Sequence, residues 1–268
     1  MTTLPKPSDW LVPDWSATGV GALMTTRFGG VSAPPFDSFN LRSQTGDMPA
    51  AVAENQARLA RIAGAVPVYL NQVHGARVVR LGRADGAPGA PVHDADASVT
   101  TLPGIACAVQ VADCLPLLFA APGGRAVGAA HAGWRGLAGG VIEASLHAIC
   151  EAASCEPSQV QAWLGPCIGP TWFEVGADVI DRFAAQMPEA GSEAGPAGLP
   201  RFVPHRPGKW LADLAGLAQD RLHAAGVRSI HGGGWCTVSD PSRFFSFRRD
   251  RVTGRMAALV WIEPGAGR

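Results

Sequence analysis

The chain has 268 residues, of which 47% are hydrophobic and 16% are charged, a composition typical of a compact globular enzyme rather than a fibrous or disordered protein. Because 22 basic residues balance 22 acidic residues, no overall field attracts the chain to nucleic acid or to an anionic membrane surface. We therefore expect small-molecule partners, with neither nucleic acid nor a membrane among them.

The N-terminal segment, MTTLPKPSDW, has no apolar stretch of the kind that a secretory signal needs. The most apolar segment, 104–122, is interrupted by Gln110, Asp113 and Pro116, which favours a buried strand over a membrane span. The six cysteines form no Cys-x-x-Cys pair and are expected to be free thiols in a reducing compartment. The predicted location is the cytoplasm.

Strands are predicted where short segments are apolar or alternating and are bounded by Gly or Pro, and helices where apolar residues recur every three or four positions. The strands outnumber the helices and do not alternate strictly with them. The sequence therefore predicts an α/β (α+β) fold, with mixed β-sheets flanked by helices. The predicted strands lie at 20–28, 67–81, 105–111, 115–120, 126–131, 160–164, 227–231 and 256–262, and the helices at 48–63, 137–150, 176–187 and 210–225.

Neither an internal repeat nor a linker divides the chain, so we expect one domain over residues 1–268. The expected oligomeric state is a monomer. Segment 188–200, PEAGSEAGPAGLP, is rich in Gly, Ala, Pro and Glu and is predicted to be a mobile surface loop. Asp47 is predicted to cap the first helix, and Gly64 to end it.

Three possible metal ligands stand at or near the ends of predicted strands: His74 in NQVHG, Cys114 in VADCLP and His131 in AAHAGWRG. Two imidazoles and a thiolate suit zinc and leave a fourth position for water or substrate, as in a catalytic zinc site. The separations match no compact metal motif, so two other interpretations stay open. In one, these residues only pack; in the other, Cys114 is a nucleophile and a histidine is its base.

Arginines in Gly- or aromatic-flanked segments form a second group of candidates. A guanidinium can bind phosphate or carboxylate through two parallel hydrogen bonds, so converging arginines would indicate an anionic substrate group. Arg135 is the strongest candidate, because it precedes a predicted helix whose free N–H groups also favour an anion. The group comprises Arg27, Arg42, Arg135, Arg248 and Arg249.

Several acidic residues are weaker candidates. Asp94 and Asp96 in HDADAS could hydrogen-bond a metal ligand from behind, although turns are the commoner reason for such residues. Asp113, beside Cys114, and Glu174 in TWFEVG are candidates for acid–base roles.

These segments occur together, and in this order, in a known family. From about residue 20 to residue 262 the chain resembles the bacterial YfiH-type family, which has been called both multicopper polyphenol oxidase, or laccase-like, and purine nucleoside phosphorylase. The matching segments are TTRFGGVS, FNL with GD, NQVHG, DADASVT, VADCLPLLF, HAGWRG, GPCIGP with FEVG, and FFSFRRD with TGRMAALVWI.

The resemblance implies a zinc site made by His74, Cys114 and His131, at which copper could also bind. It implies phosphorolysis of adenosine, inosine, guanosine and methylthioadenosine, with adenosine deamination as a side activity. Purine nucleosides and phosphate are thus the expected partners. The expected substrate- or phosphate-binding residues are Arg27, Asn40, Arg42, Gln44, Arg135 and Arg248.

Gln44 departs from the family pattern, because many members have a histidine there. Glutamine can hydrogen-bond a substrate but cannot carry a proton at neutral pH, so proton transfer at this position is not expected.

Three alternative functions remain. The first is a cysteine hydrolase or amidase that acts on peptidoglycan precursors through Cys114. The second is copper-dependent polyphenol oxidation; the chain has seven histidines and no His-x-His pair, which speaks against a multicopper cluster but permits a single copper ion. The third is a binding or scaffold protein with structural zinc, for which a fourth protein ligand would be normal.

Overall fold

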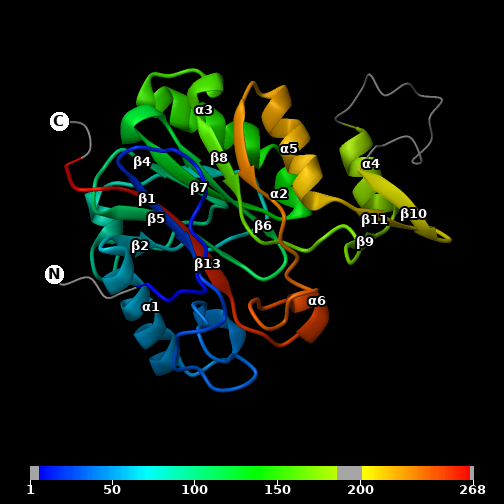
Figure 1. Cartoon of the computed structure of the whole chain (residues 1–268), viewed down its shortest axis with the longest axis horizontal. Helices are drawn as coiled ribbons and strands as arrows, with labels where there is room; N and C mark the ends of the chain where they lie inside the picture. The colour runs from blue at the N-terminus through cyan, green and yellow to red at the C-terminus, as the bar shows by residue number, and fades with distance from the viewer. Residues whose placement is uncertain (1–5, 186–200, 266–268) are drawn as a thin grey trace.

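The computed structural model describes residues 6–185 and 201–265. Within these ranges the strands form three sheets, and helices pack on the outside of the two larger ones (Figure 1). The strands are β1 (Val20–Met24), β2 (Val66–Val68), β3 (Val78–Arg80), β4 (Ala97–Thr100), β5 (Ile105–Val111), β6 (Leu115–Ala120), β7 (Val127–Ala132), β8 (Gln161–Leu164), β9 (Glu174–Val175), β10 (Phe202–Arg206), β11 (Lys209–Ala212), β12 (Ser229–Gly232) and β13 (Met256–Ile262). The helices are α1 (Pro49–Ala63), α2 (Trp134–Ala138), α3 (Val141–Ala153), α4 (Ala177–Ala184), α5 (Leu214–Ala224) and α6 (Phe247–Asp250).

The two larger sheets have the strand orders β12-β8-β6-β7-β4-β3 and β1-β13-β5-β2. Each contains both parallel and antiparallel pairs: β12 is parallel to β8 and β2 is parallel to β5, whereas β6 and β7 are antiparallel, as are β1 and β13. Mixed sheets with helices outside them confirm the fold class predicted from the sequence.

The two larger sheets pack face to face. Side chains alternate between the faces of a strand. In β13, Met256 and Val260 therefore point into the core between the sheets, whereas Leu259 points to the outer face, where it packs with Leu59 of α1. Both faces of such strands are buried, so their residues are apolar at every position rather than at every second one.

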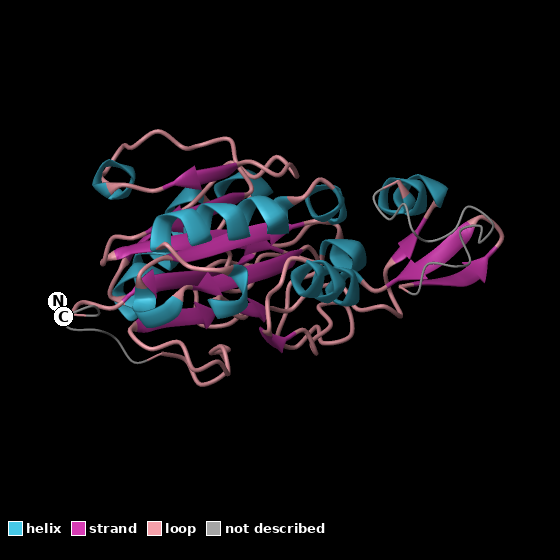
Figure 2. Ribbon diagram, turned by 90° about the horizontal axis from the view of Figure 1, so that it is seen from above, coloured by secondary structure: helices cyan, strands magenta, loops and turns pink. Residues whose placement is uncertain are grey.

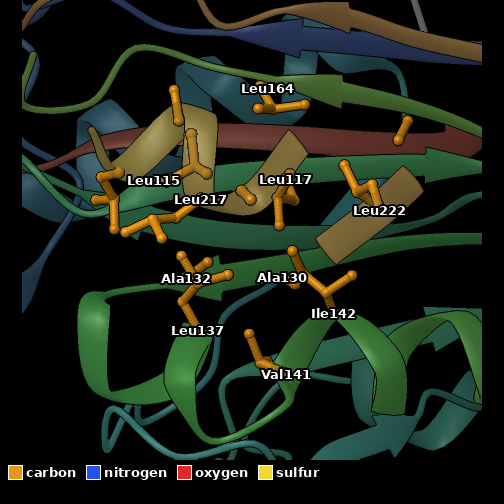
Figure 3. Packing of buried hydrophobic residues seen from close by; sticks show 14 of the residues in the cluster. Leu115, Leu117, Ala130, Ala132, Leu137, Val141, Ile142, Leu164, Leu217 and Leu222 are labelled. Atoms are coloured by element: carbon orange, nitrogen blue, oxygen red, sulfur yellow. The ribbon is translucent and has the colours of Figure 1, made fainter. Parts of the chain in front are cut away.

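The outer face of the six-stranded sheet is covered by α2, α3 and α5. Leu115 and Leu117 of β6 pack there with Ile142 of α3 and Leu222 of α5, all 0% exposed (Figure 3). This cluster holds the rim of the sheet, where β6 begins and β7 ends, in a fixed position.

The third sheet, β10-β11-β9, lies with α4 at one end of the molecule, apart from the two larger sheets (Figure 2). No helix in the described ranges is long and apolar enough to cross a membrane. The predicted loop at 188–200 falls outside the described residues. The domain bounds of 1–268, the monomeric state and the cytoplasmic location stay predictions.

Three predicted elements differ from the structure. The segment 67–81 contains β2 and β3 rather than one strand, because the backbone N–H groups of Val73, His74 and Gly75 donate to the Asp96 carboxylate instead of to a neighbouring strand. The predicted helix 137–150 is divided between α2 and α3, since Gly140 adopts a φ of 92°. The first residues of the predicted helix 210–225 belong to β11, which pairs with β9 and β10.

Of the two predictions for the ends of α1, one is confirmed and the other is wrong. Gly64 ends the helix in the left-handed region with a φ of 64°, as predicted. Asp47 is not its N-cap: Met48 is, and no side chain caps it. Asp47 instead accepts hydrogen bonds from Ser32 Oγ at 2.7 Å and from Asn40 Nδ2 at 3.0 Å, so it stabilises the loop before the helix.

Candidate metal centre and substrate cavity

Strand register brings Cys114 and His131 to one end of the six-stranded sheet. β6 and β7 are antiparallel, and Leu115 lies opposite Ala132. Cys114 directly precedes β6, and His131 is the penultimate residue of β7. His131 shares strand parity with Val127 and therefore points to the face between the two larger sheets.

Asp96 holds the other side of the site. It directly precedes β4, the other neighbour of β7, and it is 0% exposed. Its Oδ1 accepts from the backbone N–H of His74 at 2.9 Å, and its Oδ2 accepts from Gly75 at 2.7 Å. The same Oδ1 lies 2.8 Å from Nδ1 of His131. One buried carboxylate thus orients both histidines, which is the role considered for Asp96; Asp94 instead accepts from Asn71 Nδ2 at 2.7 Å.

His74, Cys114 and His131 come together as the sequence suggests they could. Their ligand atoms all lie within 4.8 Å of one another. Sγ of Cys114 is 4.0 Å from Nε2 of His74, and the two imidazoles meet edge to face with centroids 4.9 Å apart. Because Asp96 takes up Nδ1 of His131, the Nε2 atom is left to bind an ion.

The surroundings of these residues fit a bound metal ion. Two imidazoles and a thiolate are donors for zinc or copper, not for the hard cations magnesium and calcium. Gly133 leaves space beside them: a Cβ atom there would lie 3.0 Å from both Cys114 Sγ and His74 Cδ2.

We expect Gly133→Ala to lower metal affinity by about tenfold, a loss like that from disturbing the support of a ligand. Its φ of −63° and ψ of 159° suit alanine, so the effect comes from the added methyl group. Affinity is measured by competition with a chelator. Gly234→Ala is the matched control, since a Cβ there meets nothing within 4 Å. Equal metal affinity in the two variants would contradict this account of the site.

The charge state of Cys114 suits metal binding, whereas His131 must release its Nε2 proton when an ion binds. Burial alone would raise the pKa of the Cys114 thiol, but the charge and hydrogen bonds of His131 and His74 outweigh it and lower the pKa to about 6. Burial alone would lower the pKa of His131, but Cys114 and Asp96 raise it to about 9. At neutral pH and without metal, a thiolate therefore lies beside an imidazolium.

In metal-free protein, alkylation of Cys114 by iodoacetamide should increase as pH rises through about 6 and then become constant. A pKa lowered from its usual value means that the reactive thiolate is already present above that pH, whereas an ordinary thiol would keep gaining reactivity to about pH 8.5 and beyond. Mass spectrometry of the Cys114 peptide gives the rate, and bound zinc should suppress it. A rate that still rises above about pH 8 would rule out the ion pair.

Two cavities meet at His74 and Cys114, and His131 lines one of them. One, of about 390 Å³, is called the polar cavity because it is lined by the polar side chains of Arg42, Gln44, Gln72, Gln110 and Arg255. The other, of about 260 Å³, is mainly apolar and is lined by Trp134, Ile168, Phe173 and Leu214, with Arg135 and Arg248. Both are lined by His74, Cys114 and Phe247. A ligand with an anionic part and a flat apolar part could therefore contact the metal centre from both cavities.

The predicted substrate-binding residues are divided among different places. Arg42 and Gln44 line the polar cavity, and Arg135 and Arg248 line the apolar one. Arg135 is the second residue of α2 rather than the residue before a helix. The Nη1 of Arg248 donates to the carbonyls of Trp172 and Glu174, which orients its side chain along the cavity wall.

Arg27 and Asn40 lie outside the linings of the two cavities. The guanidinium of Arg27 pairs with the Asp37 carboxylate at 3.2 Å and donates to the Pro241 carbonyl at 3.0 Å. Asn40 is 0% exposed, and its Oδ1 accepts from the backbone N–H groups of Arg42 at 3.1 Å and Arg255 at 2.9 Å. It thus positions two cavity arginines from behind.

Arg249, Asp113 and Glu174 have structural partners. Arg249 pairs with Asp250 at 2.7 Å. Asp113 accepts from the Thr237 hydroxyl and from the Arg248 backbone N–H, both at 2.6 Å. Arg206 donates to the carboxylate of Glu174.

Arg255, Gln72 and Gln110 are cavity residues that were not among the predicted site residues. Gln72 is two residues before His74, and its side chain forms two hydrogen bonds of 2.8 Å with the backbone of Gln110. Arg255 directly precedes β13 within the TGR segment. Gln72 and Arg255 both lie in segments that match the family, so that match was a usable signal for them. Only the fold brings Arg255 close to Arg42.

Comparison with known proteins gives consistent results. The sequence model of a family described as multi-copper polyphenol oxidoreductase laccase matches residues 21–263. A Pseudomonas aeruginosa protein named purine nucleoside phosphorylase is 48% identical, over 95% of this chain and 98% of its own. Purine nucleoside phosphorylase YfiH of Escherichia coli is 45% identical, over 95% of this chain and 99% of its own.

Solved structures share the fold. The crystal structure of YlmD from Geobacillus stearothermophilus has a TM-score of 0.88 at 32% identity and covers 98% of this chain and 99% of that one. A Neisseria meningitidis protein has a TM-score of 0.86 at 44% identity and covers 96% of this chain and 100% of that one.

Proposed function

The chain belongs to the YfiH family, whose sequence model is described as multi-copper polyphenol oxidoreductase laccase, and on this premise we propose that it is a zinc-dependent purine nucleoside phosphorylase. Membership confirms the resemblance noted in the sequence. The proposed substrates are phosphate and adenosine, inosine, guanosine or methylthioadenosine, and adenosine deamination is a proposed side activity. The names of the relatives support an enzyme of this kind.

The observation that carries the proposal is a pair of arginines beside the metal ligands, both lining one cavity and neither in an ion pair within the described residues. Arg42 and Arg255 both line the polar cavity. Arg255 donates to the carbonyls of Thr253 and Gly254, and neither arginine forms an ion pair with a carboxylate among the described residues. Burial lowers the pKa of Arg255, and the like charge of Arg42 lowers it further. A dianion such as phosphate would relieve this repulsion.

The apolar cavity suits the purine. Trp134, Phe173 and Phe247 supply aromatic surfaces against which a flat base can stack. Because this cavity meets the polar one at His74 and Cys114, a nucleoside with its base against the aromatic rings would present its sugar towards Arg42 and Arg255. Phosphate held there is close to the sugar carbon that it must attack.

Phosphorolysis forms a bond from a phosphate oxygen to C1′ while the N-glycosidic bond breaks, and the base leaves with the electron pair. In the proposal, Arg42 and Arg255 hold the phosphate, and Gln44 hydrogen-bonds substrate without transferring a proton. A zinc ion held by His74, Cys114 and His131 would supply Lewis acidity where the cavities meet. Asp96 keeps His131 oriented throughout.

The test is to incubate the metal-loaded protein with adenosine, with and without phosphate. The proposal requires adenine and ribose 1-phosphate in equal amounts only when phosphate is present. Inosine formed without phosphate would report the deaminase side activity. Absence of ribose 1-phosphate at full metal occupancy would overturn the proposal.

Arg42→Ala should raise the KM for phosphate by about tenfold or more, the loss of a charge-assisted contact, and change the KM for adenosine much less. Initial rates at varied phosphate and saturating adenosine measure the effect. Arg80→Ala, an exposed arginine on β3, is the control. If Arg135→Ala raised the phosphate KM and Arg42→Ala did not, phosphate would bind in the apolar cavity instead.

A second candidate is the cysteine hydrolase or amidase, which the lowered pKa of Cys114 favours. Labelling of Cys114 by a substrate-like electrophile in the presence of zinc, unaffected by chelator, would support it. A Cys114→Ser variant that stays active would exclude it.

Copper can replace zinc at the same ligands. The described residues gather only two of the seven histidines into a group that could hold a metal ion, which disfavours multicopper chemistry.

A further inference from the structure

A third hollow, of about 400 Å³, adjoins the metal centre on another side. It shares His74, Trp134 and Arg135 with the apolar cavity, whereas only His74 is common to it and the polar cavity. Its remaining lining includes Arg182 of α4. Because all three linings contain His74, a sugar beside His74 could present C1′ towards Arg42 and Arg255 and direct a substituent past Trp134 and Arg135 into this hollow.

The hollow combines small residues with cations. Gly75, Ala76 and Gly139 line it without bulky side chains. The guanidinium of Arg135 stacks on the indole of Trp134, with its central carbon 4.4 Å from the ring centroid, so it is held at the boundary with the apolar cavity. Stacking leaves the edge of a guanidinium free to donate hydrogen bonds.

Positive charge exceeds negative charge in the hollow. Arg135 and Arg182 face one acidic residue, Asp178, which lies one turn before Arg182 on α4. Among the described residues, neither arginine forms an ion pair with a carboxylate. Two guanidiniums beside a single carboxylate leave a net charge for which an anionic group is the matching ligand.

Phosphorolysis of a neutral nucleoside needs one anion, the phosphate for which Arg42 and Arg255 already provide. We propose that the hollow at Arg135 and Arg182 binds an anionic substituent on the sugar of a purine nucleoside, a phosphate or a carboxylate, so that the ligand class extends to charged nucleoside derivatives. This inference rests on the proposed function for the identity of the purine part. The hollow itself predicts only the anion.

The test is direct binding, which needs no turnover. Isothermal titration of the metal-loaded protein with adenosine 5′-monophosphate should give a Kd about tenfold lower than that for adenosine, the gain expected from a charge-assisted contact. Arg182→Ala should abolish this difference and leave the Kd for adenosine unchanged. Arg228→Ala, an exposed arginine before β12, is the matched control and should change neither value. High salt should reduce the difference.

A 5′-carboxylate analogue of adenosine tells which anion is preferred, since the tighter of the two identifies the group. Equal Kd values for adenosine and both charged analogues would overturn the proposal, and so would a difference that persists in Arg182→Ala. Inorganic phosphate alone is also titrated. If Arg182→Ala abolished its binding and Arg42→Ala did not, the hollow would be the phosphate site and the proposal would be wrong.

These outcomes separate the two proposals. Tight, Arg182-dependent binding of the monophosphate without phosphorolysis of adenosine would remove the proposed activity and leave the anion site. Phosphorolysis of adenosine with no gain from the charged substituent would leave the activity and remove the anion site.

Discussion

His131→Ala is expected to abolish metal binding and phosphorolysis together. His131 is 3% exposed, and it supplies one of three ligands whose atoms lie within 4.8 Å of one another. The strand fixes the cavity left by the missing ring, so no other side chain can replace the donor. We expect metal affinity to fall at least about a hundredfold, since a zinc site distributes some 10 kcal/mol or more over its few ligands.

The variant also leaves the Asp96 carboxylate without its imidazole partner at 2.8 Å. Asp96 keeps its backbone N–H partners but loses a hydrogen bond to a charged group, worth about 1.5–3 kcal/mol, so the metal-free variant should also unfold at a lower temperature than the metal-free parent. Metal content by elemental analysis and ribose 1-phosphate formation are the two measurements. His93→Ala is the control, because His93 pairs with Asp85 outside both cavities.

Metal content and ribose 1-phosphate formation need not change together in this variant, and each combination has a different meaning. Loss of activity with metal retained would mean that His131 acts on the substrate rather than on the ion. Full activity with metal bound would mean that the metal is held elsewhere, and the proposed function would lose its site.

From the residues alone a metal site at His74, Cys114 and His131 was one of three interpretations, and the resemblance to the family implied it. The pairing of Leu115 with Ala132 brings Cys114 and His131 together, whereas His74 lies in the loop between β2 and β3 and is held by Asp96. The arginines could not be sorted in this way. Arg27 and Arg42 look alike in sequence, but Asp37 pairs with Arg27 and leaves Arg42 without such a partner, a difference that depends on how loops fold.

The elements of the fold also differ in whether the local sequence was enough to predict them. α1 and β5 were predictable because their patterns run over 15 and 7 residues. The segment 209–212 was not, because Trp210 and Leu211 suit a helix or a strand equally, and only the pairing of Leu211 with Glu174 and Val203 makes it a strand. β9 has 2 residues and no pattern of its own. Elements that depend on a distant partner carry little local signal.

Asp96→Asn is expected to have the next largest effect, although Asp96 is not itself a proposed ligand. Its two oxygens accept from His131 Nδ1 and from the backbone N–H groups of Val73, His74 and Gly75. An amide offers one oxygen, and its NH₂ group would face donors. At least one buried N–H therefore loses its acceptor, at about 1–3 kcal/mol, and the His74 loop loosens.

Metal affinity should consequently fall about 10- to 100-fold, the usual cost of losing the group that orients a metal-bound histidine. Burial alone would raise the pKa of Asp96, but hydrogen bonds from His131 and Gly75 outweigh it and hold the pKa below its usual value. The wild-type protein thus loses stability as pH falls through that lowered pKa, and Asp96→Asn should lack this part of the acid dependence. Urea unfolding of the metal-free proteins from about pH 3 to pH 7, with chelator competition at neutral pH, measures both effects. Asp94→Asn, two residues away and bonded to Asn71, should show neither; if it matched Asp96→Asn, the loop rather than the carboxylate behind His131 would determine metal affinity.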